Sequence, residues 1–96
     1  MRQKQPEPLS NIISNLLQRL GLETKVKEHE AIVKWPQIVG QKISKVTVAN
    51  KTVDGILFVK VKNNAWRTEL VFLKRDILRK IDETIGMGVI KDIRFL

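Results

Sequence analysis

Histidine and acidic side chains are the groups of this chain best suited to catalysis, but their spacing does not bring them together. His29 is the only histidine, and cysteine is absent, which excludes disulfides and thiolate metal sites. Asp82 and Glu83 are adjacent on a predicted helix, so their side chains diverge. Gly86 and Gly88 precede a predicted strand, whereas a phosphate-binding loop opens a helix. We therefore predict no catalytic residue, no metal site and no cofactor, and a protein that is not an enzyme.

Cationic side chains on predicted strands have a spacing suited to binding a polyanion. Side chains alternate between the two faces of a strand, so if Leu57, Val59 and Val61 face the core, the residues between them share the opposite face. A basic face with an aromatic residue can follow a phosphate backbone and stack a base. The alternative, to which we give equal weight, is that the lysines keep an exposed sheet face soluble and protect its edges from aggregation. The predicted nucleic-acid-binding residues are Lys45, Lys51, Phe58, Lys60, Lys62 and Arg94.

Three aromatic residues are candidates for contact with a protein partner. Trp35 and Trp66 are expected to anchor the core, but tryptophan is also frequent among the residues that dominate interface energies. Phe72 lies off the main apolar stripe of its predicted helix, so it either broadens the core or is exposed for a partner. We assign Trp66, Phe72 and Trp35 as the predicted protein-partner residues.

The elements that must position these residues follow from hydrophobic periodicity and from residues that end helices or form turns. Gly21 and Pro36 end the first two helices, and Asp54-Gly55 predicts a hairpin turn. Val46 and Val48 are expected to face the helices. The predicted helices cover residues 9–20, 24–34, 36–45 and 65–85, and the predicted strands cover 46–53, 56–62 and 89–95. This order predicts an α+β domain with a small three-stranded mixed sheet and helices packed on one face.

Length and charge limit the class of protein further. The 96 residues suffice for one domain, predicted over 9–96 after a flexible N-terminal arm at 1–8. The net charge of +8 favours nucleic acid, an anionic membrane or an acidic protein as a partner. The apolar stretch 9–20 is shorter than the ~20 residues of a membrane span. Because Arg19 is its only charge, we expect this helix to pack on the domain and predict no membrane partner.

Two tryptophan motifs, placed on either side of the predicted hairpin, give a family resemblance. They read Trp35-Pro36-x-Ile38-Val39-Gly40 and Ala65-Trp66-x-x-Glu69-Leu70. With the final Ile93-Arg94-Phe95, they resemble the DciA family of bacterial replicative-helicase operators across most of the chain. The resemblance implies a fold similar to the K-homology (KH) type, binding to the DnaB helicase, assistance in its loading and affinity for single-stranded DNA. The matched positions are Trp35, Gly40, Trp66, Glu69 and Leu70.

Three hypotheses for function follow from these observations. The first is a non-enzymatic, cytoplasmic and nucleoid-associated factor that is a monomer on its own and binds the replicative helicase and single-stranded DNA. The alternative is a general single-stranded nucleic-acid-binding module without a helicase role. A KH domain that clamps RNA carries a Gly-x-x-Gly loop, and this sequence has none. The third, a nucleotide-processing enzyme, requires the acidic residues to converge in a pocket.

Overall fold

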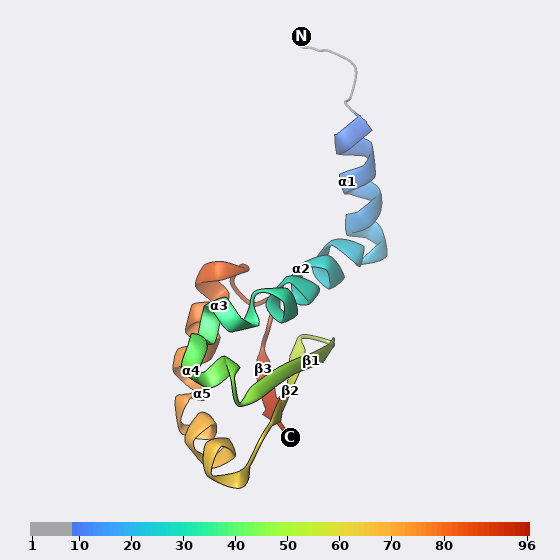
Figure 1. Cartoon of the computed structure of the whole chain (residues 1–96). Helices are drawn as coiled ribbons and strands as arrows, with labels where there is room; N and C mark the ends of the chain where they lie inside the picture. Colours follow the sequence, from blue (N-terminus) through green and yellow to red (C-terminus); the bar gives the residue numbers. More distant parts are fainter. Residues whose placement is uncertain (1–8) are drawn as a thin grey trace.

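The part of the chain that the computed structural model describes, residues 9–96, forms five helices and three strands (Figure 1). The arm predicted over residues 1–8 lies outside the described residues. The helices are α1 (Leu9–Leu20), α2 (Leu22–Val33), α3 (Trp35–Val39), α4 (Gln41–Ser44) and α5 (Asn64–Thr84). The strands are β1 (Thr47–Val53), β2 (Ile56–Val61) and β3 (Asp92–Phe95).

The sheet has the strand order β1-β2-β3, with β1 and β2 antiparallel and β2 and β3 parallel. Asp54 and Gly55 form the hairpin turn with positive φ angles of 51° and 82°, as a tight hairpin requires. The long helix α5 then returns the chain so that β3 pairs beside β2 (Figure 1). The predicted α+β class and three-stranded mixed sheet are confirmed.

The helix predicted over residues 36–45 is wrong, because Gly40 divides that segment into α3 and α4. Gly40 has φ 89° and ψ 167°, which a right-handed helix cannot contain. Its backbone N–H still bonds the carbonyl of Pro36 at 2.9 Å, so α3 ends in a hydrogen-bonded turn. The result is a break between α3 and α4, and α4 then leads the chain toward β1.

The buried core lies between one face of the sheet and the helices. Trp35, Leu57, Leu70, Ile81, Ile93 and Val59 are the largest fully buried side chains. The expected orientation of β1 is wrong at its start: Thr47 is 6% exposed and faces this core, whereas Val48 is 61% exposed. The Thr47 hydroxyl is tolerated there because it accepts a hydrogen bond from Trp35 and donates one to the carbonyl of Ile43.

A β-bulge restores the orientation of the second half of β1. The pairing with β2 shifts between Ala49 and Lys51, leaving Asn50 without a partner on β2. Because the bulge adds one residue, Lys51 lies on the same face as Val48 despite their odd spacing. Lys51 is therefore opposite Phe58, on the face turned away from the core.

Helix α1 does not pack on the domain as expected. Figure 1 shows it extending from the N-terminal end of α2, away from the sheet and α5. Its apolar residues Ile12, Ile13, Leu16 and Leu20 are 46–60% exposed. Gly21, with φ 73°, turns the chain between α1 and α2, so the two helices do not form one continuous rod. Within residues 9–96, no helix has both the length and the apolar character needed to cross a bilayer.

Candidate binding surfaces

The face of the sheet turned away from the core, termed here the open face, carries a basic row across all three strands. Lys51 pairs with Phe58, and Phe58 pairs with Arg94, so the aromatic residue lies between two cationic ones. The Lys51 ammonium lies 5.4 Å from the centroid of the Phe58 ring, within the range of a cation–π contact. The ring is therefore covered on one side by a charged group.

Three further lysines lie together at one end of the open face. Lys45, Lys60 and Lys62 border a shallow hollow of about 310 Å³, which Val46 and Val48 also line. Lys45 precedes β1, but the backbone N–H of Lys62 bonds the carbonyl of Val46 at 2.9 Å and so holds the two segments together. The structure thus places Lys51, Phe58 and Arg94 in one row across the strands, and Lys45, Lys60 and Lys62 around one hollow.

Asp92 supplies a negative charge at the β3 edge of this face. Its carboxylate lies 3.1 Å from Lys74 Nζ and 3.5 Å from Arg94 Nε. Partial burial raises the pKa of Asp92. The opposing effects are larger and leave the pKa below its usual value: they are hydrogen bonds from Lys74, the Ile93 backbone N–H and Arg94, together with the charge of Lys74. Asp92 is therefore ionised at neutral pH and offsets part of the charge of Arg94.

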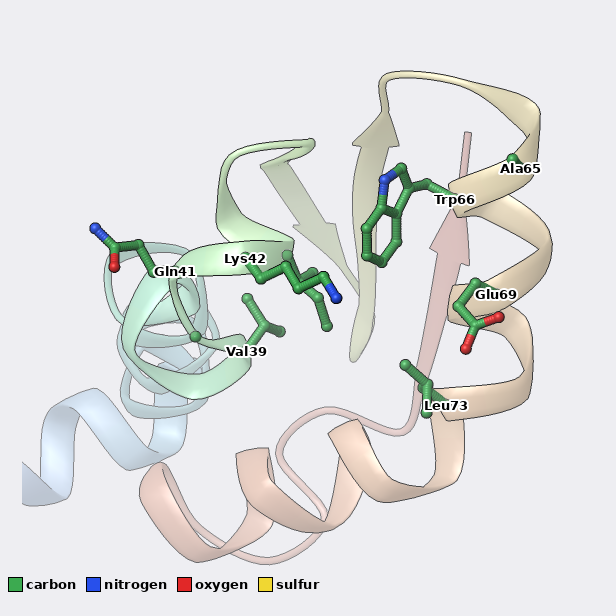
Figure 2. Close-up of a pocket in the computed structure, with 9 residues that line it drawn as sticks. Val39, Gln41, Lys42, Ala65, Trp66, Glu69 and Leu73 are labelled. Atoms are coloured by element: carbon green, nitrogen blue, oxygen red, sulfur yellow. The ribbon is translucent and has the colours of Figure 1, made fainter.

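A second candidate surface is a groove of about 620 Å³ between the α3–α4 segment and α5. Figure 2 shows Trp66 and Lys42 projecting into this groove from opposite sides, with Glu69 and Leu73 on the α5 side. The start of α5 is fixed by Asn63, whose side chain accepts a 2.9 Å hydrogen bond from the Trp66 backbone N–H. We call this surface the Trp66 groove. It is lined by Val39, Gly40, Gln41, Lys42, Ile43, Ala65, Trp66, Glu69 and Leu73.

The three aromatic candidates for protein contact have different surroundings. Trp35 is 2% exposed, and its indole is held by the hydrogen bond to Thr47, so no surface of its side chain is available to a partner in this structure. Trp66 is half-buried and lines the groove. Phe72 is 80% exposed on the outer side of α5, beside the exposed Val71. Trp66 and Phe72 therefore mark two different surfaces of the same helix.

The groove was not predicted from the sequence, although both tryptophan motifs contribute residues to it. Gly40 comes from the first tryptophan motif, and Trp66 and Glu69 come from the second. Trp35 and Leu70 are buried in the core instead. The signal available in the sequence was the pair of motifs. Whether the two motifs lie close together in space depends on how α3 and α5 pack.

Groups suited to catalysis do not assemble at either surface. Among residues 9–96, no three His, Asp or Glu side chains gather in a way that would hold a metal ion. His29 is exposed on α2, and Glu69 is the acidic residue of the Trp66 groove. The chemistry that both surfaces offer is charge, apolar contact and aromatic stacking.

A small α+β domain with a basic open sheet face and an apolar groove is typical of a binding module. Comparison with known families identifies which one: residues 8–95 match the family described as "Dna[CI] antecedent, DciA". The chain belongs to the DciA family, as its tryptophan motifs predicted, and this membership is consistent with a role in DNA replication.

Curated relatives agree with this assignment. The chain is 32% identical over 91 residues to a UPF0232 protein of Rhodococcus jostii, covering 95% of this chain and 48% of the relative. UPF0232 proteins of Mycolicibacterium paratuberculosis and Mycobacterium tuberculosis are 29% and 26% identical over the same length, with 50% and 49% of each relative covered. The chain thus spans about half the length of the curated relatives it matches.

Proposed function

We propose that this chain is a non-enzymatic DNA-replication factor of the bacterial cytoplasm and nucleoid, which binds the replicative DnaB-type helicase and assists its loading. In this proposal the Trp66 groove contacts the helicase, and the domain also has affinity for single-stranded DNA. The observation that carries the proposal is that both motifs of the family pattern contribute to one groove.

The composition of the groove supports a protein partner. Val39, Ile43 and Leu73 form apolar walls beside the Trp66 ring, and burying such surface drives association. Lys42 and Glu69 add one charge of each sign, which suits an amphipathic segment with matching charges. A half-buried tryptophan lining a groove is the kind of residue that dominates an interface.

Size-exclusion chromatography and pull-down with the cognate DnaB-type helicase test this proposal. We expect a complex at micromolar concentrations and low salt, and about a 30-fold or greater weakening for Trp66→Ala. Because Trp66 also contacts the core, the exposed variant Glu69→Arg provides a second measurement that does not depend on packing.

Phe72→Ala is the matched control, since it truncates an exposed aromatic side chain on the same helix but outside the groove. If Phe72→Ala loses helicase binding while Trp66→Ala and Glu69→Arg retain it, the helicase contact lies on the outer side of α5 instead. The absence of any complex would sink the helicase proposal.

A general single-stranded nucleic-acid-binding module remains the second candidate, and the basic open face favours it. It predicts salt-sensitive binding to DNA or RNA that falls when Lys60 and Lys62 are replaced by Glu, without any complex with the helicase. The same chromatography, run with and without a single-stranded oligonucleotide, separates the two candidates.

A further inference from the structure

We propose that the open face binds single-stranded nucleic acid by stacking one unpaired base on Phe58, and that Lys51 covers this ring until the base replaces it. The inference rests on the single-stranded DNA affinity of the proposed function and assigns it to one face and one aromatic residue. It also predicts a preference for single strands over duplex.

The register of the sheet places cations on both sides of the ring. Lys51, Phe58 and Arg94 are direct neighbours on β1, β2 and β3, and adjacent strands lie about 4.8 Å apart. A base stacked on Phe58 would therefore have a positive charge on either side, within reach of the phosphates that flank it. This arrangement combines the two elements of a single-strand site, a stacking ring and basic side chains.

The backbone of the nucleic acid has a basic path leading away from Phe58. Lys60 and Lys62 follow at every second residue, so successive positions are about 6.6 Å apart on the same face. The path ends at the hollow that Lys45 also borders. One stacked base and phosphates on three lysines correspond to a footprint of about four nucleotides, at the lower end of known single-strand sites.

Duplex DNA cannot use the ring in this way. Its bases are stacked on one another inside the helix, so no flat base surface is available to the ring, and the phosphates are the main contact left to the basic side chains. The lysines and Arg94 would still attract a duplex, but Phe58 would contribute nothing to that complex. Replacing Phe58 should therefore weaken single-strand binding and leave duplex binding unchanged.

Lys51 has two opposing effects in this arrangement. In the free protein its ammonium lies over one side of the Phe58 ring, and a base that stacks on that side must displace it. In the complex the same ammonium is free to neutralise a phosphate. The first effect weakens binding at every salt concentration, whereas the second strengthens it mainly at low salt.

Fluorescence anisotropy with labelled dT12, rU12 and a twelve-base-pair duplex tests the inference. We expect Phe58→Leu to weaken dT12 binding about tenfold, with rU12 behaving alike because stacking tolerates any base. Lys51→Ala should bind dT12 more weakly than the wild type at low salt. At high salt it should bind about two- to fivefold more tightly, because the ring is already uncovered.

Two matched controls accompany these variants. Lys60→Ala removes a lysine of the same face that does not cover the ring. It should weaken binding most at low salt and should not strengthen binding at high salt. Phe72→Leu changes an exposed aromatic residue outside the face and should leave binding unaltered. If Phe58→Leu fails to fold by circular dichroism, the reversal between low and high salt for Lys51→Ala still decides the question.

Two outcomes would overturn the inference. The first is equal affinity for dT12 and the duplex. The second is that Phe58→Leu has no effect on dT12 binding while Lys51→Ala binds dT12 more weakly than the wild type at every salt concentration. Those outcomes would leave the proposed function intact, with DNA bound elsewhere. Failure to bind dT12 at any salt would remove the single-stranded DNA affinity from the proposed function as well. The helicase complex is measured separately, and Phe58→Leu should not affect it.

Discussion

Replacement of Thr47 by Val removes the acceptor of a buried tryptophan hydrogen bond and little else. Trp35 Nε1 donates to Thr47 Oγ1 at 2.9 Å, and Oγ1 donates to the Ile43 carbonyl at 2.8 Å. That carbonyl also accepts a 3.0 Å bond from the Val46 backbone N–H, so it keeps a partner in the variant. Valine has nearly the same volume as threonine, so no cavity forms. The indole N–H is left unpaired in the core.

An unpaired buried donor costs about 1–3 kcal/mol, and exchange of the hydroxyl for a methyl recovers only a small part of this. We therefore expect Thr47→Val to lower the free energy of unfolding by about 2 kcal/mol. In a domain of this size, that corresponds to a fall in Tm of roughly 8–16 °C. Thr47→Ser keeps the hydroxyl and loses one methyl group, so we expect a smaller loss of about 1 kcal/mol.

Urea denaturation followed by circular dichroism measures these differences, and a double-mutant cycle assigns their cause. In a Trp35→Phe background the indole N–H is absent, so the further change Thr47→Val should cost almost nothing. The reasoning is refuted if Thr47→Val is as stable as the wild type. It is equally refuted if Thr47→Val costs the same with Phe at position 35 as with Trp.

Three further results are expected. The first assumes that Lys45, Lys51, Lys60 and Lys62 each contact one phosphate. Raising the salt concentration from 50 to 200 mM then weakens single-strand binding by the wild type about 50-fold. In the double variant Lys60→Gln/Lys62→Gln the same change in salt weakens binding only about sevenfold. A salt titration by anisotropy measures the slope, and an unchanged slope would exclude these lysines. Because the pKa of Asp92 is lower in the folded protein, its stabilisation is present above an unfolded pKa of about 3.9 and is lost as pH falls through the folded value. Acid denaturation should therefore show a shallower loss of stability in Asp92→Asn than in the wild type, and identical profiles would contradict the ion pairs. Asn63→Ala removes the cap of α5 and should cost about 1 kcal/mol in urea denaturation, whereas Asn63→Asp should retain most of the stability.

Elements whose residues repeat with a strong local period were predicted well from the sequence. Helix α5 has apolar residues at helical spacing and an Asn63 cap, and it lies within one residue of the expected bounds. Strand β2 alternates strictly, so its core face and open face follow from the sequence. The Asp54-Gly55 turn adopts the positive φ angles that its residue types favour.

The errors lie where tertiary contacts decide between local alternatives. Valine and threonine both suit a strand, so the orientation of β1 depended on the partner that Trp35 gives to Thr47 and on the bulge at Asn50. Gly40 is compatible with a helix interior at modest cost, and only the packing of α3 and α4 reveals a break there.

The sequence by itself determined the α+β class, the two faces of β2, the family and the positive charge, because each depends on residue types and short spacings. Only the tertiary structure decided that Gly40, Trp66 and Glu69 border one groove and that Lys51 lies over Phe58. Both arrangements join residues from different elements, so they depend on the packing of α3 against α5 and on the register of β1 with β2. A local pattern contains no information about such distances, because packing and strand register are settled by the whole core.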